Sequence, residues 1–402
     1  MVGNRLDRKA AKLIVNALRR GVPPRGQALE LTVGRDREID YFSRKLDEVA
    51  ETGLSDVKFI SAEIGGGKSH FLDILETLAK ERNFVVSKVD LESRSTRFDH
   101  FEEVYRKLVG GIATKMHPND GLTSILETWA RQYQGATDTW IFAELRQIPE
   151  LPAQLRSALL EYGKAVAKDE GVIETLTDLI SWISGEKVTA AQRKRLNVTA
   201  PVGRTNAAEM LRGLMGLFRV QGHSGFVVLL DEAESITSLM RVQDRNAANE
   251  NIRSIIDGAD ENEGFYFVFA TTPSFLDPAA IKGAATYQAL WRRISDPLAG
   301  RGRSLDRVII ELPALTEAEY AMLAVRIKEI AEIGVGKPSQ ITAEQLGMLA
   351  TYAQNQPSGR VSTLVRAAAQ LLSDSYENPE FDFESEYIFV VEEAAERAND
   401  EV

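Results

Sequence analysis

The sequence predicts an α/β fold with a parallel sheet flanked by helices, and three observations support this class. Apolar runs at 226–230 and 265–270 each fit a buried strand, and a short apolar run, Val57, Phe59 and Ile60, fits another strand. Long stretches with apolar residues at helical spacing separate these runs. Parallel strands need long crossover connections, and helices usually form them.

The chain opens with two predicted helices. Residues 5–20 place Leu and Ile side chains at helical spacing, with Arg and Lys between them, and the run ends at the helix-stopping segment 21–24. A second amphipathic helix extends to about Ala50. It begins in the segment 33–38, Val-Gly-Arg-Asp-Arg-Glu, whose composition is also typical of an ordinary helix start.

The first apolar run leads into a glycine-rich loop and then into an amphipathic helix. This order of strand, loop and helix is the context of a phosphate-binding P-loop, in which backbone N–H groups and the positive end of the helix face an anion. Lys68 is expected to reach the β- and γ-phosphates of ATP, and the Ser69 hydroxyl to ligate Mg²⁺. The residues expected to bind the nucleotide here are Glu63, Ile64, Gly65, Gly66, Gly67, Lys68, Ser69 and His70.

The loop departs from the strict P-loop pattern at one position, where Ala62 replaces the first Gly. Alanine fits if the backbone there has a negative φ. The alternative is a purely structural glycine-rich turn. Lys68 and Ser69 in register, together with a second motif downstream, favour the nucleotide-binding interpretation.

After a further predicted strand at 83–91, residues 94–220 read as mostly helical. We interpret 94–204 as a large helical insertion and expect its tryptophans, Trp129, Trp140 and Trp182, to be core anchors. The core fold then comprises 1–93 and 205–313. A helical lid of three amphipathic helices is expected at 314–376, with a capping box at its start. An acidic segment follows at 377–402, with one possible short strand at 387–391.

The second motif is the strand at 226–230, which ends in Asp231 and Glu232. Ligands bind at the carboxyl ends of strands in open α/β sheets, so Asp231 is expected to hold the Mg²⁺ shell. Glu232 is expected to polarise the water that attacks the γ-phosphate. The alternative is a helix start that favours acidic residues. The P-loop upstream argues against that alternative.

The order of these elements resembles an AAA+ ATPase of the origin-recognition group. The stretches 15–26, 33–38, 63–72 and 83–89 together resemble the BREX-system ATP-binding BrxD family. The resemblance covers nearly the whole chain. It implies a prokaryotic anti-phage defence role, alongside DNA and a helicase or other defence-system partner.

The resemblance also implies roles for residues outside the two motifs. Gly34 and Arg35 match a segment that wraps the adenine. Thr271, or its neighbour Thr272, matches a polar residue that contacts the γ-phosphate or the attacking water; a hydroxyl capping a turn is the alternative. Either Arg292 or Arg293 matches the arginine finger given to a neighbouring subunit, with a solvated ion pair as the competing reading. Arg360 matches the arginine by which the lid reaches the phosphates.

The composition limits the kinds of metal site and binding partner that the protein is expected to have. The chain has 402 residues, a net charge of −11, no cysteine and four histidines, so thiolate and His-based metal sites are disfavoured. The charge argues against indiscriminate coating of nucleic acid, but basic segments at 5–25 and 187–204 are candidates for local DNA contact; solvated helix faces are the alternative. No signal peptide or membrane span is seen, and we expect a cytoplasmic protein.

The leading hypothesis is therefore a Mg²⁺-dependent ATPase that couples turnover to assembly on DNA or on a partner. An arginine finger in trans implies a homo-oligomer. The alternative is a nucleotide-dependent interaction switch or scaffold with negligible hydrolysis. A small-molecule kinase predicts a shorter insertion and an acceptor site, and the sequence offers neither.

Overall fold

The structure is a computed structural model that describes residues 6–22, 24, 26–91, 96–259, 264–295, 304–356 and 361–400. The chain divides into two compact units. The first unit comprises Met1–Asp40, Ser61–Thr77 and Glu311–Val402. The second unit comprises Tyr41–Ile60 and Leu78–Ile310.

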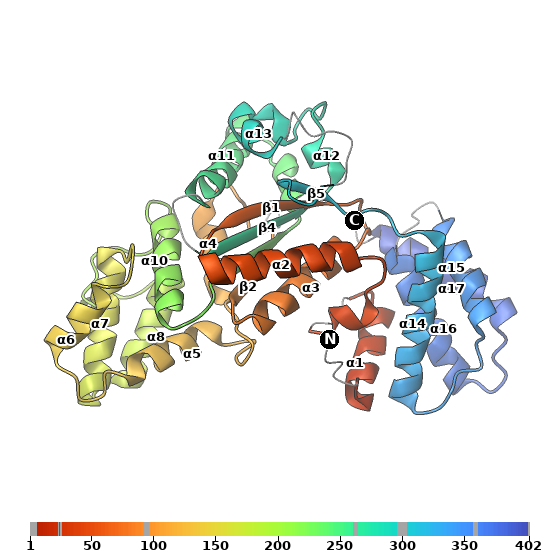
Figure 1. Cartoon of the computed structure of the whole chain (residues 1–402), viewed down its shortest axis with the longest axis horizontal. Coiled ribbons are helices and arrows are strands. Elements are labelled where there is room, and N and C mark those ends of the chain that lie inside the picture. The colour runs from red at the N-terminus through yellow and green to blue at the C-terminus, as the bar shows by residue number, and fades with distance from the viewer. Residues whose placement is uncertain are drawn as a thin grey trace. The chain divides into compact units, whose positions relative to one another are not determined.

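The second unit is built on a five-stranded parallel sheet with the order β2-β3-β4-β1-β5, which confirms the predicted class (Figure 1). Every residue of β3 and β4 is buried, as expected for strands with helices on both faces. In register, Val85 pairs with Phe226, and Phe226 with Phe265. The strands are β1 (Asp56–Ser61), β2 (Val85–Asp90), β3 (Phe226–Asp231), β4 (Phe265–Thr271) and β5 (Ile309–Glu311).

Aromatic contacts show which helices cover the two faces of the sheet. Phe218 of α10 (Ala207–Val220) lies 5.5 Å from Phe226, centroid to centroid. Phe42 of α2 (Asp36–Thr52) lies 6.2 Å from Tyr266. Tyr266 pairs with Val227, the neighbour of Phe226, so it points to the opposite face. Helices α10 and α2 therefore cover opposite faces.

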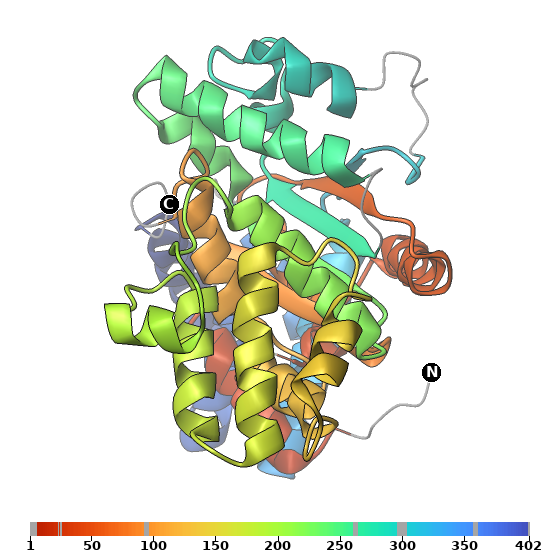
Figure 2. The ribbon, with the colours of Figure 1, turned by 90° about the vertical axis from the view of Figure 1, so that its left-hand side faces the viewer.

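The chain between β2 and β3 is helical, as expected. Its hydrophobic core is continuous with that of the sheet, so these helices pack as part of the second unit. Figure 2 shows α7 and α8 side by side in yellow and yellow-green. The helices are α4 (Phe101–Gly110), α5 (Gly121–Arg131), α6 (Asp138–Leu145), α7 (Ala153–Lys168), α8 (Val172–Ile183), α9 (Ala190–Arg195) and α10.

Two of the three tryptophans in this region are core anchors. Trp129 and Trp182 are almost fully buried, and the indole N–H of Trp182 donates to Ala200 O at 2.9 Å. The prediction was wrong for Trp140, which is 43% exposed. Its ring packs edge-on against Tyr133 with a centroid distance of 5.3 Å, on the outer side of α6.

The carboxyl half of the second unit contains the elements that follow β3 and β4. Leu290 and Ile294 are buried on one face of α13, as their i, i+4 spacing predicts. The elements are η2 (Ala233–Ser238), α11 (Val242–Ala259), α12 (Pro273–Leu276), η3 (Ala284–Thr286) and α13 (Gln288–Ile294).

The first unit is a helical bundle that carries the glycine-rich loop. Its hydrophobic core joins α1 to the C-terminal helices, and Figure 1 shows α1 in red beside α14 in blue. The capping box expected at the start of the lid is present, since Thr316 and Glu319 bind each other's backbone N–H groups. The elements are α1 (Arg8–Arg19), η1 (Ala28–Leu31), α3 (Lys68–Glu81, up to Thr77), α14 (Glu317–Val335), α15 (Ala343–Gln354), α16 (Val361–Glu377) and α17 (Phe383–Asp400).

The prediction of a short strand at 387–391 was wrong, because this stretch lies inside α17. Phe383 and Val391 are buried, with Tyr387 half-buried between them at a four-residue spacing. That spacing places all three on one helix face. Phe389, which would be an inward residue of a strand, is 64% exposed.

Candidate functional site

The glycine loop of the first unit requires glycine for physical reasons. Gly65 and Gly67 have φ values of 76° and 89°, which side chains with a Cβ rarely adopt. A Cβ on Gly66 would lie 2.9 Å from Glu63 O, the carbonyl that accepts from Gly66 N. Helix α3 then begins at Lys68, so its first N–H groups belong to the loop. The geometry is that of an anion cradle.

Ala62, which replaces the first Gly of the strict P-loop pattern, meets the expected condition of a backbone without positive φ. Ala62 is buried and is not among the residues with positive φ. The conformation therefore does not require glycine at this position. The nearby ammonium of Lys68 donates to Ala62 O at 3.0 Å and to Glu63 O at 3.4 Å, which holds the lysine over its own loop.

A cavity of about 230 Å³ opens beside this loop, entirely within the first unit. Residues 65–70 form one wall. Apolar side chains from α1, η1, α14, α16 and the segments that adjoin them form the others, and no sequence pattern marked these side chains as site residues. The apolar members are Leu18, Val22, Pro24, Leu31, Val33, Leu315, Leu323, Val361 and Val365.

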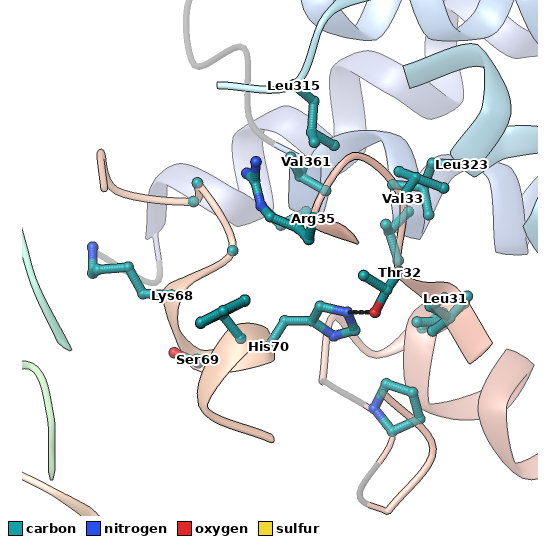
Figure 3. A pocket seen from close by; sticks show the side chains of 18 of the residues that line it. Leu31, Thr32, Val33, Arg35, Lys68, Ser69, His70, Leu315, Leu323 and Val361 are labelled. Carbon is teal, nitrogen blue, oxygen red and sulfur yellow. Dashed lines mark hydrogen bonds between the residues drawn. The ribbon is translucent and has the colours of Figure 1, made fainter. Parts of the chain in front are cut away.

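The polar side chains of Thr32 and Arg35 lie between the loop and the apolar wall (Figure 3). The Thr32 hydroxyl donates to Ala28 O at 2.8 Å, so its oxygen can accept from His70 Nε2, 3.3 Å away. Arg35 also lines the cavity, whereas Gly34, Glu63 and Ile64 do not. Figure 3 shows Lys68 extending away from Leu31, Val33 and Leu323.

The cavity and loop together fit a nucleoside polyphosphate. An anion cradle borders an apolar chamber, and 230 Å³ lies just below the range of roughly 300–1,000 Å³ typical of small-molecule sites. The described residues hold no group of three or more His, Asp or Glu side chains that could enclose a metal ion. Mg²⁺ in phosphate sites needs only one or two protein ligands, since phosphates and water supply the rest.

In the second unit, β3 ends at Asp231 and Glu232 follows it directly. Asp231 is 3% exposed, and its Oδ1 accepts from Glu232 N at 3.0 Å. Glu232 is exposed and takes a left-handed conformation, with φ 57° and ψ 40°. Such backbone is costly for a residue with a Cβ and is often kept where a side chain must be aimed.

The two candidate threonines at the end of β4 differ in their hydrogen bonds. Thr272 Oγ1 lies 2.9 Å from Ser274 Oγ and is therefore engaged in a hydrogen bond. Thr271 is completely buried, and its hydroxyl has no hydrogen-bond partner among the described residues. Asn249 of α11, which the sequence analysis missed, is also completely buried, and neither its amide nitrogen nor its amide oxygen has a hydrogen-bond partner in the described part of the chain. Buried polar groups without partners cost stability, and no sequence pattern marks Asn249.

The two candidate fingers on α13 also differ. The Arg293 guanidinium pairs with Asp257, whereas Arg292 is exposed and makes no hydrogen bond or ion pair with any described residue. Arg360, the predicted lid arginine, lies outside the described residues.

The basic segment 187–204 is not uniformly available for DNA. Arg195 pairs with Glu174 and with the buried carboxylate of Asp178, so its guanidinium is already engaged within the fold. Lys194 is exposed. In α1, Arg8 donates to the carbonyls of Gly334 and Val335, which leaves fewer free cations than the composition suggests.

Within the part of the chain that the structure describes, no helix combines the length and apolarity needed to cross a membrane. No curated protein matches the chain. The sequence model of one family, described as BREX system ATP-binding protein BrxC/D, matches residues 6–390. The chain belongs to the BREX system ATP-binding protein BrxC/D family.

Proposed function

We propose that this protein binds Mg²⁺-ATP and hydrolyses it as part of a prokaryotic anti-phage BREX defence system. One observation carries the binding half of the proposal. A glycine loop with the backbone of an anion cradle borders an apolar cavity of about 230 Å³ in the first unit. The family description, ATP-binding protein, supports the choice of nucleotide.

Each residue has a defined task in this proposal. The loop N–H groups and Lys68 hold the phosphates, and Leu31, Val33 and Leu323 surround the base. The Ser69 hydroxyl and the Asp231 carboxylate would supply the protein oxygens for Mg²⁺, which would neutralise phosphate charge. Glu232 orients the attacking water.

The second half of the proposal concerns coupling. Turnover drives assembly on DNA, on a helicase or other defence-system protein, or both, in the cytoplasm. Homo-oligomerisation would let Arg292 act in a neighbouring subunit, and its lack of a hydrogen bond or ion pair with the described residues supports that role. Arg193 and Lys194 of α9 are the proposed DNA contacts, since Arg195 is engaged within the fold.

Steady-state ATPase assays of wild type and Glu232→Gln, each with and without duplex DNA, test hydrolysis. We expect Glu232→Gln to bind ATP but to lose turnover, because the amide accepts a proton or orients water poorly. Equal background rates in the two proteins, with ATP binding intact, would instead establish the nucleotide-dependent switch.

DNA coupling has its own test. The double variant Arg193→Ala/Lys194→Ala should weaken duplex binding and flatten its dependence on salt, because fewer counterions are released. Glu186→Gln, an exposed change near the same helix, is a control that does not remove a cation. Unchanged affinity and salt slope in the double variant would remove α9 from the proposal.

A further inference from the structure

The segment Val33–Arg35 is fastened to the start of the C-terminal bundle. Arg35 Nη2 donates to Pro313 O at 2.7 Å, and Nη1 lies 3.3 Å from Gly34 O. Gly34 has φ 65°, and a Cβ built on it would lie 2.1 Å from Glu319 Oε1. Glycine is therefore needed at 34 both for the backbone and for the close approach of the Glu319 carboxylate.

The charges around Arg35 match this arrangement. Its side chain is buried, with the residue 7% exposed, and burial lowers the pKa of the guanidinium. Two carboxylates, Glu38 and Glu319, oppose that effect. Glu319 is held by Thr316, and the hydrogen bonds from Thr316, aided by Arg35, lower the pKa of its carboxyl group. A buried guanidinium is tolerated only where such partners surround it.

The segment Val33–Arg35 is fastened to the connection from β5 to α14. β5 ends at Glu311 and α14 begins at Glu317, so Pro313 lies in the connection. Leu315 from this connection and Leu323 from α14 line the cavity, as does Arg35 itself. Figure 3 shows Arg35 between the glycine loop and the side chains of Leu315 and Val361.

We infer that Arg35 is a positioning residue that keeps the apolar half of the cavity assembled. It latches the connection 312–316 to the segment Val33–Arg35. Its hydrogen bonds go to Pro313 O and Gly34 O, and the charges of Glu38 and Glu319 stabilise its guanidinium. This inference rests on the proposed function. It differs from a direct contact between Arg35 and the nucleotide, because the latch governs affinity for the nucleoside part and leaves the phosphate cradle unchanged.

Binding calorimetry with two probes, Mg²⁺-ATP and inorganic tripolyphosphate, separates these roles. In Arg35→Ala we expect the Kd for ATP to rise roughly tenfold or more, because only a fraction of molecules retains the assembled cavity. Affinity for tripolyphosphate should stay at the wild-type value. Gly34→Ala disturbs the same latch from its backbone side and should reproduce the effect, which keeps the test valid if Arg35→Ala fails to fold.

The matched control is Arg326→Ala. Arg326 also ties the N-terminal part to α14, donating to Glu30 O at 2.8 Å, but it does not line the cavity. Its loss should leave both affinities unchanged. Unaltered ATP affinity in Arg35→Ala, an equal loss for tripolyphosphate, or an equal loss in Arg326→Ala would each overturn the latch. Failure of wild type to bind ATP would instead overturn the proposed function.

Discussion

The guanidinium of Arg293 donates to the carboxylate of Asp257, with Nε 2.8 Å from Oδ1, and so joins α13 to α11. The neighbouring Arg292 makes no such pair with the described residues. Arginine fingers supply large rate factors, so we expect Arg292→Ala to lower kcat roughly a hundredfold or more in the assembled protein. Steady-state ATPase assays as a function of protein concentration measure this.

Arg293→Ala is the control for that prediction. It should lower the free energy of unfolding by less than about 1 kcal/mol, because the lost pair is partly exposed to solvent. Its kcat should stay close to wild type. A larger loss of turnover in Arg293→Ala than in Arg292→Ala would reverse the assignment of the two arginines.

Thr271→Val removes a buried hydroxyl that has no hydrogen-bond partner within the residues that the structure describes. We expect the free energy of unfolding to rise by about 1 kcal/mol, since the desolvated hydroxyl is replaced by a methyl group. If the hydroxyl senses the nucleotide, kcat should fall roughly tenfold or more at the same time. Chemical denaturation and ATPase assays on the same preparation check both parts.

Thr272→Val is the matched variant, because it removes a hydroxyl bonded to Ser274. It should lower the free energy of unfolding by about 0.5–1.5 kcal/mol. Stability changes of the same sign in the two variants would contradict the distinction between these threonines.

Arg195→Ala leaves the buried carboxylate of Asp178 with Gln192 as its remaining partner among the described residues, Nε2 to Oδ1 at 2.7 Å. We expect a loss of about 1–3 kcal/mol in the free energy of unfolding, moderated by the partial exposure of Arg195. Lys194→Ala, one residue away and exposed, should change stability by less than about 0.5 kcal/mol. Equal stability of the two variants in urea titrations would contradict the structural role of Arg195.

Glu250 gives a pH dependence with a defined sign. Hydrogen bonds from Arg253 and then Tyr287 lower the pKa of its carboxyl group to about 2. The unfolded value is near 4.3, so its stabilisation is complete above that pH and is lost as pH falls toward 2. Glu250→Gln should therefore destabilise the protein near neutral pH, by less than about 1 kcal/mol for so exposed a network.

The measurement for Glu250 is thermal unfolding of wild type and Glu250→Gln at several values between pH 2 and 7. The gap between the two melting temperatures should narrow as the pH falls through 4. A gap that widens toward pH 2 would mean that the carboxylate is not stabilised by its neighbours.

The sequence predicted the sheet and both motif-bearing strands, because glycine spacing and fully apolar runs are local patterns. The walls of the cavity were not predicted, since Leu31, Leu315 and Val361 are ordinary apolar residues that only folding brings together. The strand prediction failed at 387–391, because the aromatic and β-branched residues there are typical of a strand but pack at helical spacing. The engagement of Arg195 was equally hidden, because its partner Asp178 is seventeen residues away.

The central claim is that a nucleoside triphosphate binds at the loop that ends in Lys68. Isothermal titration calorimetry of the full-length protein with Mg²⁺-ATP tests it most directly, with Lys68→Ala as the comparison. We predict saturable binding at one site in wild type and an affinity lower by at least roughly tenfold, or about 1.4 kcal/mol, in the variant. No binding to folded wild type, or equal affinity in the two proteins, would contradict the claim.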